Sequence, residues 1–432
     1  MLLRYLKKIF YNSVAELRIH IGKSTILWEK TSFSRAFKFL KNNSLSRAEL
    51  SDDNGNVKNI HYGDILIKFS ECLYADERNN IPYIINDNIA YKLLKLSPLI
   101  NGDIVFADAA EDNTVGKCTE IITHNDTDLV AGLHTIPCRP TIKFAEGYLG
   151  YYLNSTAFHN QLLQYIQGTK ISSISKKSIC QTIISYPSEI INQQKIASYF
   201  QSLDSLIQTT SKELASLKQI KAASLQSMFP QEEETVPKVR FKGFEEEWSL
   251  KYVFELLCER NELSPQSPEF PLMAFIANNG IAEKGERYDR SALVNDVINK
   301  QYKRTYYGDF IYSSNNLETG SIGLNTYGKA TISPVYSIFY CTLNSDSNFV
   351  GYCMTRKSFI KEMIKWRQGV MYGQWRIHEK DFLRIKVLVP SLPEQQQIGT
   401  YFRNLDQQIS LQTQRLEKLK QIKTACLDKM FV

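Results

Sequence analysis

Two stretches of the chain repeat apolar residues at the three- and four-residue spacing that is typical of an amphipathic helix. The first stretch runs from Ile196 to Phe229 and the second from Ile398 to Phe431. In both, the apolar residues follow a heptad seam, with charged and amide side chains between them. Each stretch has 34 residues, which at a rise of about 1.5 Å per residue predicts a helical rod of roughly 50 Å.

An isolated helix with one apolar stripe is unstable in water, so each stripe needs a partner. The simplest arrangement is that the two helices pack on each other as a coiled coil. A whole globular region separates the two helices along the chain, which favours an antiparallel pairing. The alternative is that each helix buries its stripe on its own domain.

The two helical stretches are copies of one another. Both contain Tyr-Phe-x-x-Leu-Asp, at Tyr199–Asp204 and Tyr401–Asp406, then Leu-Lys-Gln-Ile-Lys, and both end in Met-Phe. A Pro-Ser pair and a run of Gln precede each copy, and a fainter echo pairs Tyr148–Tyr152 with Phe349–Cys353. The chain is therefore a tandem duplication with a period of about 200 residues.

The ends of the two helices carry their own signals. Ser391 and Glu394 fit a capping box, in which the Glu394 carboxylate would accept a hydrogen bond from the Ser391 amide. Ile191 stands at the corresponding place after Ser188, so the first helix has the weaker start. Pro230 predicts the end of the first helix.

The segments before the helices contain short β-branched or aromatic runs after turn signals, which predict strands. These runs are Gly63–Lys68, Gly102–Phe106, Gly308–Tyr312 and Ile385–Val389. We therefore predict an α+β fold, with two strand-rich globular domains separated by two long helices that pair as an antiparallel coiled coil. The predicted divisions are 1–185 for the first domain, 186–230 for the central helix, 231–388 for the linker and second domain, and 389–432 for the C-terminal helix.

Composition narrows the class of protein without naming a function. The apolar fraction of 43% in 432 residues excludes general disorder, and the net charge of +7 permits contact with nucleic acid without requiring it. The eight cysteines contain no Cys-x-x-Cys pair, so we expect free thiols in a reducing cytoplasm and no zinc site or disulfide framework. No apolar run is long enough to predict a membrane span.

The usual catalytic signatures are absent from the sequence. It contains no GxxxxGK[ST] phosphate loop, no GxSxG elbow and no HExxH metal motif. Asn80–Tyr83 faintly resembles the Asn-Pro-Pro-Tyr motif of amino-methylating enzymes, but the second proline is missing and no glycine-rich loop accompanies it. We therefore expect no catalytic residue and no metal or cofactor bound by this chain.

Basic residues interleaved with aromatic ones are the remaining candidates for function. Lys and Arg neutralise phosphates, and Arg and Gln also read base edges in the major groove. The alternative interpretation is a solvated basic face on a helix through Ser358–Trp366. The candidates for DNA contact in the second half are Lys303, Arg304, Lys365, Arg367, Gln374 and Arg376, and those in the first half are His134, Arg139 and Lys170.

The repeated helices, each preceded by Pro-Ser and a Gln run and each carrying Ile-x-x-Tyr-Phe-x-x-Leu-Asp, resemble the conserved regions of the specificity (S) subunit of type I restriction–modification systems. The block Pro237–Trp248 is similar to the segment that opens the second target-recognition domain in such subunits. The resemblance covers the chain from about Trp28 to Val432. Residues 1–27 depart from it, because they have no counterpart of the Arg-Phe-x-Gly-Phe block.

The resemblance implies two target-recognition domains at opposite ends of an antiparallel helical pair, related by a pseudo-two-fold axis. Each domain would read one half of a split site in double-stranded DNA, and the helices would set the gap. The subunit itself would be non-catalytic. It would dock two modification subunits, which use S-adenosylmethionine to methylate adenines, and ATP- and Mg-dependent restriction subunits. The docking residues implied on the helices are Lys218, Lys221, Lys420 and Lys423.

Two other classes of function stay open at this point. One is a single-chain enzyme that both recognises and modifies DNA, although the missing catalytic motifs argue against it. The other is a structural coiled-coil adaptor without any role in DNA binding.

Overall fold

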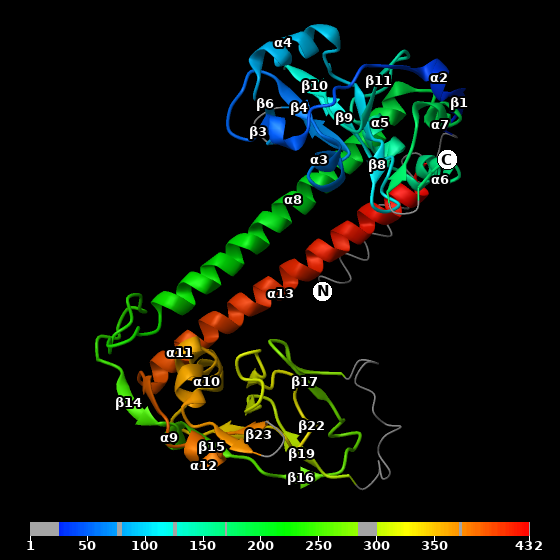
Figure 1. The fold of residues 1–432 in the computed structure, drawn as a ribbon. Helices are drawn as coiled ribbons and strands as arrows, with labels where there is room; N and C mark the ends of the chain where they lie inside the picture. Colours follow the sequence, from blue (N-terminus) through cyan, green and yellow to red (C-terminus); the bar gives the residue numbers. More distant parts are fainter. Residues whose placement is uncertain are drawn as a thin grey trace. The chain divides into compact units, whose positions relative to one another are not determined.

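The computed structural model describes residues 26–75, 80–123, 128–168, 171–283, 300–370 and 374–431 (Figure 1). Lys170 and most of the atypical start therefore lie outside the described residues. The chain divides into two compact units. The first comprises the described residues up to Ser211 together with those from Arg415 onward, and the second runs from Lys212 to Gln414. Each unit thus includes one part of each long helix.

The two long helices are α8 (Ile190–Ser227), green in Figure 1, and α13 (Leu392–Lys429), red in the same view. Each has 38 residues, so the predicted helices are confirmed and begin a turn or more before the heptad seam. The Gln runs explain the early start. The Gln193 amide accepts a hydrogen bond from Ala145 N at 3.0 Å and donates one to Pro187 O at 2.8 Å, so it joins the helix to its domain. Gln395 bonds Asp346 N and Pro390 O in the same way.

The first unit is built on a five-stranded sheet in the order β2-β11-β7-β9-β5, with a second sheet in the order β10-β4-β6-β3. Strand β7 is buried along its whole length, as its apolar sequence Ile-Val-Phe-Ala requires. Phe33, Phe106 and Tyr148 lie in its main core. The elements are β1 (Trp28–Ser32), α2 (Phe33–Ala36), β2 (Phe37–Phe39), η1 (Arg47–Glu49), β3 (Leu50–Ser51), β4 (Lys58–Ile60), α3 (Tyr62–Ile67), β5 (Cys72–Tyr74), β6 (Tyr83–Ile84), α4 (Asp87–Leu96), β7 (Ile104–Ala107), β8 (Ala109–Ala110), β9 (Cys118–Ile122), β10 (Leu129–Ala131), β11 (Thr135–Pro140), α5 (Tyr148–Leu153), α6 (Thr156–Leu163), β12 (Ser172–Ser173), α7 (Lys176–Cys180) and β13 (Ile183–Pro187).

The second unit has a four-stranded sheet in the order β15-β23-β20-β21 and a three-stranded sheet in the order β16-β19-β22. Phe310, Phe339 and Phe382 lie in its main core. The elements are β14 (Ser249–Tyr252), α9 (Val253–Leu256), β15 (Leu257–Glu259), β16 (Leu263–Ser264), β17 (Ala274–Ile276), β18 (Gly280–Ala282), β19 (Tyr302–Thr305), β20 (Phe310–Tyr312), β21 (Ile322–Leu324), β22 (Ala330–Ile332), β23 (Ser337–Cys341), α10 (Ser347–Met354), α11 (Lys357–Ile364), β24 (Gln368–Val370), β25 (Gln374–Arg376), α12 (Glu379–Phe382) and β26 (Lys386–Val389).

Within each unit, the two long helices pack against one another in antiparallel directions. In the first unit, Tyr199 meets Cys426 while Asp204, further along α8, meets Lys423, which is earlier in α13. In the second unit, Lys221 meets Asp406, and the Ser224 and Tyr401 hydroxyls lie 2.9 Å apart. The predicted packing of the two helices is confirmed. The helices also bury apolar residues on the domains, as the stacking of Phe200 on Tyr151 at 4.7 Å shows.

Each long helix ends inside the core of a globular domain. Phe431, which follows α13, packs against Phe200 and Tyr152 of the first unit at ring distances of 5.9 and 5.6 Å. Phe229, which follows α8, packs against Phe402 and Phe349 of the second unit at 6.0 and 5.8 Å. The repeated Met-Phe ends are therefore core residues.

Two predictions of local structure are wrong. The sequence pattern predicts a strand over Gly63–Lys68, but Tyr62–Ile67 is helix α3, because His61 Nδ1 accepts a hydrogen bond from Gly63 N and so caps a helical turn. The Glu394 carboxylate does not complete a capping box with Ser391. It accepts two hydrogen bonds of 2.7 Å from the Arg240 guanidinium instead. The strands expected near Ile104, Phe310 and Val387 are confirmed as β7, β20 and β26.

Candidate nucleic-acid interface

A hairpin in the second unit presents polar and aromatic side chains. Helix α11 ends at Ile364, and the chain continues through Lys365 into β24, which pairs antiparallel with β25. Gln374, Trp375 and Arg376 of β25 are all exposed. Lys365 is also exposed, and its ammonium lies 2.5 Å from Glu362. The structure thus places three of the predicted DNA-contact residues, Lys365, Gln374 and Arg376, at the surface of one region.

Arg376 and Lys303 share one acidic neighbour. Arg376 Nη2 lies 3.4 Å from Glu379 Oε2, and Glu379 also accepts a hydrogen bond from Ser337 at 2.8 Å. Burial opposes ionisation of Glu379, but its hydrogen bonds and the charges of Arg376 and Lys303 together hold its pKa below the ordinary value. Lys303 itself is buried, and its ammonium donates to Tyr336 O at 3.0 Å. Arg376 is therefore the more accessible cation.

Arg304 and Arg367 lie in different surroundings. Arg304, on β19, donates from Nε to Ser264 Oγ at 2.8 Å and stacks on Phe270 with its guanidinium carbon 4.6 Å from the ring centre. The Arg367 side chain is only 10% exposed, and its Nη1 donates to Glu318 Oε2 at 2.9 Å. Its Nε and Nη2 are buried and have no hydrogen-bond partner among the described residues. A contact between Arg367 and DNA would need a change in this packing.

The candidates of the first unit lie at two places. His134 has the left-handed backbone conformation, with φ of 53°, and its Nδ1 lies 3.1 Å from Asp108 Oδ1. Arg139 is held by Asp103 through hydrogen bonds of 2.7 and 2.8 Å and donates to Pro98 O. Their use as DNA contacts, like that of Lys170, stays a prediction.

A cavity of about 450 Å³ lies beside His134. Its lining includes Asn42, Asn43 and Asp108, whose side chains can donate to or accept from base edges. The Asn43 amide is already bonded to Asn59 Oδ1 and Ala131 O. Sequence reasoning did not single out these asparagines, although Asn42-Asn43-Ser44 is a polar run that begins three residues after the end of strand β2.

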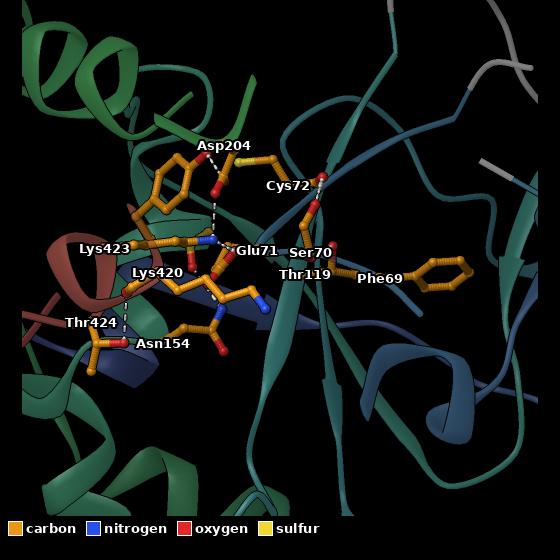
Figure 2. A network of polar contacts seen from close by, with 12 residues as sticks. Phe69, Ser70, Glu71, Cys72, Thr119, Asn154, Asp204, Lys420, Lys423 and Thr424 are labelled. Atoms are coloured by element: carbon orange, nitrogen blue, oxygen red, sulfur yellow. Dashed lines mark hydrogen bonds and ion pairs between the residues drawn. The ribbon is translucent and has the colours of Figure 1, made fainter. Parts of the chain in front are cut away.

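The lysines expected to dock partner subunits fall into two groups. Lys218 and Lys420 are exposed on the helices. Lys221 and Lys423 instead form ion pairs within the chain, and Figure 2 shows Lys423 between Asp204 and Glu71. Docking at all four positions stays a prediction, and the geometry makes Lys218 and Lys420 the more available pair.

The comparisons with known proteins agree on one family. The sequence model of the type I restriction modification DNA specificity domain matches residues 54–219 and again residues 250–421, which together exceed half of the chain. The chain belongs to this family. A comparison with curated protein sequences finds no match.

One solved structure shares the fold of this chain. The S subunit of a type I restriction–modification system from M. genitalium is similar with a TM-score of 0.58 and 14% identity, over 95% of this chain and 97% of that chain. The HsdS subunit from Thermoanaerobacter tengcongensis has 16% identity over 95% of this chain and 98% of that chain, with a TM-score of 0.45.

Across the described residues, no three His, Cys, Asp or Glu side chains gather in a way that could hold a metal ion. Within the same residues, no helix combines the length and apolar character that are needed to cross a membrane.

Proposed function

We propose that this chain is the DNA-specificity subunit of a type I restriction–modification complex and recognises a split site in double-stranded DNA. The observation that carries the proposal is the tandem match to the DNA specificity domain, at residues 54–219 and 250–421. Because each half of the chain contains its own copy of the domain, each would read one half of the site.

Exposed basic and amide side chains support the proposal in the second unit. Arg376 and Lys365 supply cations for phosphates, and Arg376 and Gln374 have the donors that recognise base edges. Trp375, 48% exposed on the same strand, adds an aromatic surface to this region. In the first unit, the cavity beside His134 offers amide and carboxylate groups.

The chain would contribute recognition while partner subunits supply catalysis. Modification subunits would use S-adenosylmethionine to methylate adenines, and restriction subunits would use ATP and Mg²⁺. The exposed Lys218 and Lys420 on the long helices are the docking contacts that we propose. No step of the methyl transfer is assigned to a residue of this chain.

Methylation mapping tests the proposal. The chain is co-expressed with a modification subunit, and methylated adenines are mapped across the host genome. We expect one split motif, and exchange of residues 28–186 or 248–389 for those of another family member should change one half only. A motif that neither exchange alters would refute the proposal. Methylation by the purified chain with S-adenosylmethionine alone would favour a single-chain enzyme, and failure to bind any duplex at low salt, even with the modification subunit, would favour an adaptor.

Arg376→Ala tests the second recognition surface. Loss of a base-reading guanidinium is expected to weaken duplex binding by about 1–3 kcal/mol. The measurement is fluorescence anisotropy with a duplex that carries the mapped motif. Lys68→Ala is the matched control, because Lys68 is also an exposed cation and forms an ion pair with a nearby residue in the sequence, Asp64. Unchanged affinity and an unchanged motif in Arg376→Ala would remove Arg376 from the recognition surface.

A further inference from the structure

Lys423 joins three elements of the first unit (Figure 2). Its ammonium on α13 lies 2.7 Å from Asp204 Oδ1 on α8 and 2.6 Å from Glu71 Oε2 of the domain. Asp204 also accepts a hydrogen bond of 2.8 Å from the Tyr151 hydroxyl on α5. We call Asp204, Lys423, Tyr151 and Glu71 the first clamp.

The second unit repeats this arrangement with corresponding residues of the duplicated sequence. Lys221 on α8 lies 2.5 Å from Asp406 Oδ1 on α13, and the Tyr352 hydroxyl on α10 donates to Asp406 Oδ2 at 2.6 Å. The ammonium also lies near the tyrosine ring in both units, at 5.5 Å for Lys221 and 5.8 Å for Lys423. We call Asp406, Lys221 and Tyr352 the second clamp. Each clamp lies within one unit.

The clamp tyrosines lie on helices α5 and α10, whose first turns are hydrogen-bonded to acidic side chains. In the first unit, the buried Glu120 carboxylate accepts hydrogen bonds from Gly147 N and Gly150 N, at 2.8 and 2.7 Å, at the start of α5. In the second unit, Asp346 caps α10 by accepting a hydrogen bond from Phe349 N at 2.8 Å. Each clamp aspartate therefore meets both the opposite long helix and a short helix of its domain.

The apolar seam alone does not fix how the helices are aligned. A slip of one heptad, roughly 10 Å along the axis, would again place apolar residues against apolar residues. The ion pairs do not tolerate such a slip. A shift of seven residues in either direction would replace Lys423 by Leu416 or Met430 opposite Asp204. It would likewise place Leu214 or Met228 opposite Asp406.

The clamp side chains are also partly removed from water. In the first clamp, Lys423 is 17% exposed and Glu71 14%. The second clamp is more open, with Lys221 27% and Asp406 40% exposed. Ion pairs of this kind add little net stability, because desolvation offsets their attraction, but a misaligned state that leaves their charges unpaired is costly. In some proteins, residues of this kind serve to specify one arrangement over its alternatives.

We propose that Asp204 and Asp406 are positioning residues, which fix the register of α8 against α13 and thereby the number of base pairs between the two halves of the recognised site. The proposal rests on the proposed function, since it assigns residues to the spacing of a split DNA site. Neither aspartate touches DNA in this scheme. In each clamp, the lysine of the opposite helix selects the register by pairing with the aspartate. The tyrosine of the domain bonds the same carboxylate and so positions the domain against the helices.

Charge reversal in the second clamp tests the proposal in the full chain, co-expressed with the modification subunit. The variants are Asp406→Lys, Lys221→Asp and the combination of both. Each single reversal places like charges together, so we expect both half-site sequences to persist while methylated sites with altered spacing increase roughly tenfold. The combined reversal restores opposite charges and should restore the single spacing. Asp428→Lys, the same charge change at an exposed position of α13, should leave the spacing unaltered.

The possible outcomes separate this proposal from the proposed function. If the parent complex methylates no split motif, the proposed function fails. If the parent methylates a split motif and both single reversals keep its one spacing, the register proposal fails while the proposed function stands. Asp406→Asn is the milder variant, because it removes the charge but keeps the volume. Loss of all methylation in Asp406→Asn and in the reversals alike would also overturn the proposal, since the clamp would then serve folding alone.

Discussion

Replacement of Phe431 by alanine is expected to destabilise the first unit by about 3–5 kcal/mol, the usual cost of removing a buried phenylalanine from a core. The ring is 6% exposed and packs against Tyr148, Tyr152 and Phe200. It comes from the far end of the sequence, and its removal leaves a cavity in a core that is formed mostly by residues before Ser211, with Cys426 of α13 beside them. Unfolding in urea measures the change in the free energy of unfolding, and hydrogen exchange then shows which residues lose protection.

The unit in which exchange protection is lost distinguishes a cavity in one core from a general destabilisation of the chain. Exchange protection should fall first in the first unit for Phe431→Ala and in the second unit for Phe229→Ala, which removes the corresponding ring. Leu411→Ala is the control, because Leu411 lies on α13 but is 54% exposed. Equal loss of protection in both units for Phe431→Ala would contradict the assignment of this ring to one core.

The sequence predicts those elements in which a regular spacing of apolar residues repeats over many turns. The heptad pattern predicts α8 and α13 because a run of 38 residues repeats it many times. A run of six residues is too short to repeat the pattern, so it does not distinguish a helix from a strand. Tyr62–Ile67 has the apolar content of a strand, and the His61 cap that makes it a helix is a single contact outside the apolar pattern.

The candidate site shows a second limit of the sequence. Basic residues can be recognised in a sequence, but their partners lie far away along the chain. Lys423 bonds Glu71, 352 positions earlier, and so is an internal ion pair although it belongs to a repeated basic motif. Lys303 and Arg367 likewise bond groups that are distant along the chain, the Tyr336 carbonyl and the Glu318 carboxylate.

Loss of Arg240 is the second change from which we expect a large effect. The Glu394 side chain is 1% exposed, and the Arg240 guanidinium meets both of its oxygens at 2.7 Å. Arg240→Met would leave this carboxylate buried beside an apolar group, which costs about 3–5 kcal/mol. The measurement is the free energy of unfolding of the second unit in urea, with Lys238→Met as the control, because Lys238 is exposed in the same linker block.

The paired variant separates the cost of an unpaired charge from the value of the ion pair itself. Arg240→Met combined with Glu394→Met removes both charges, and most of the lost stability should return, because a buried ion pair and an apolar pair of similar volume differ little in free energy. A double variant as unstable as Arg240→Met alone would show that the pair, and not the orphaned carboxylate, stabilises this start of α13. The duplication agrees with a coupled pair. The first copy has no acid at the Glu394 position, whether the position is counted from Ser188, which gives Ile191, or from the Gln run, which gives Asn192. Residues 1–27 also contain no Arg-Phe-x-Gly-Phe block, so neither the acid nor the arginine is found in the first half of this sequence.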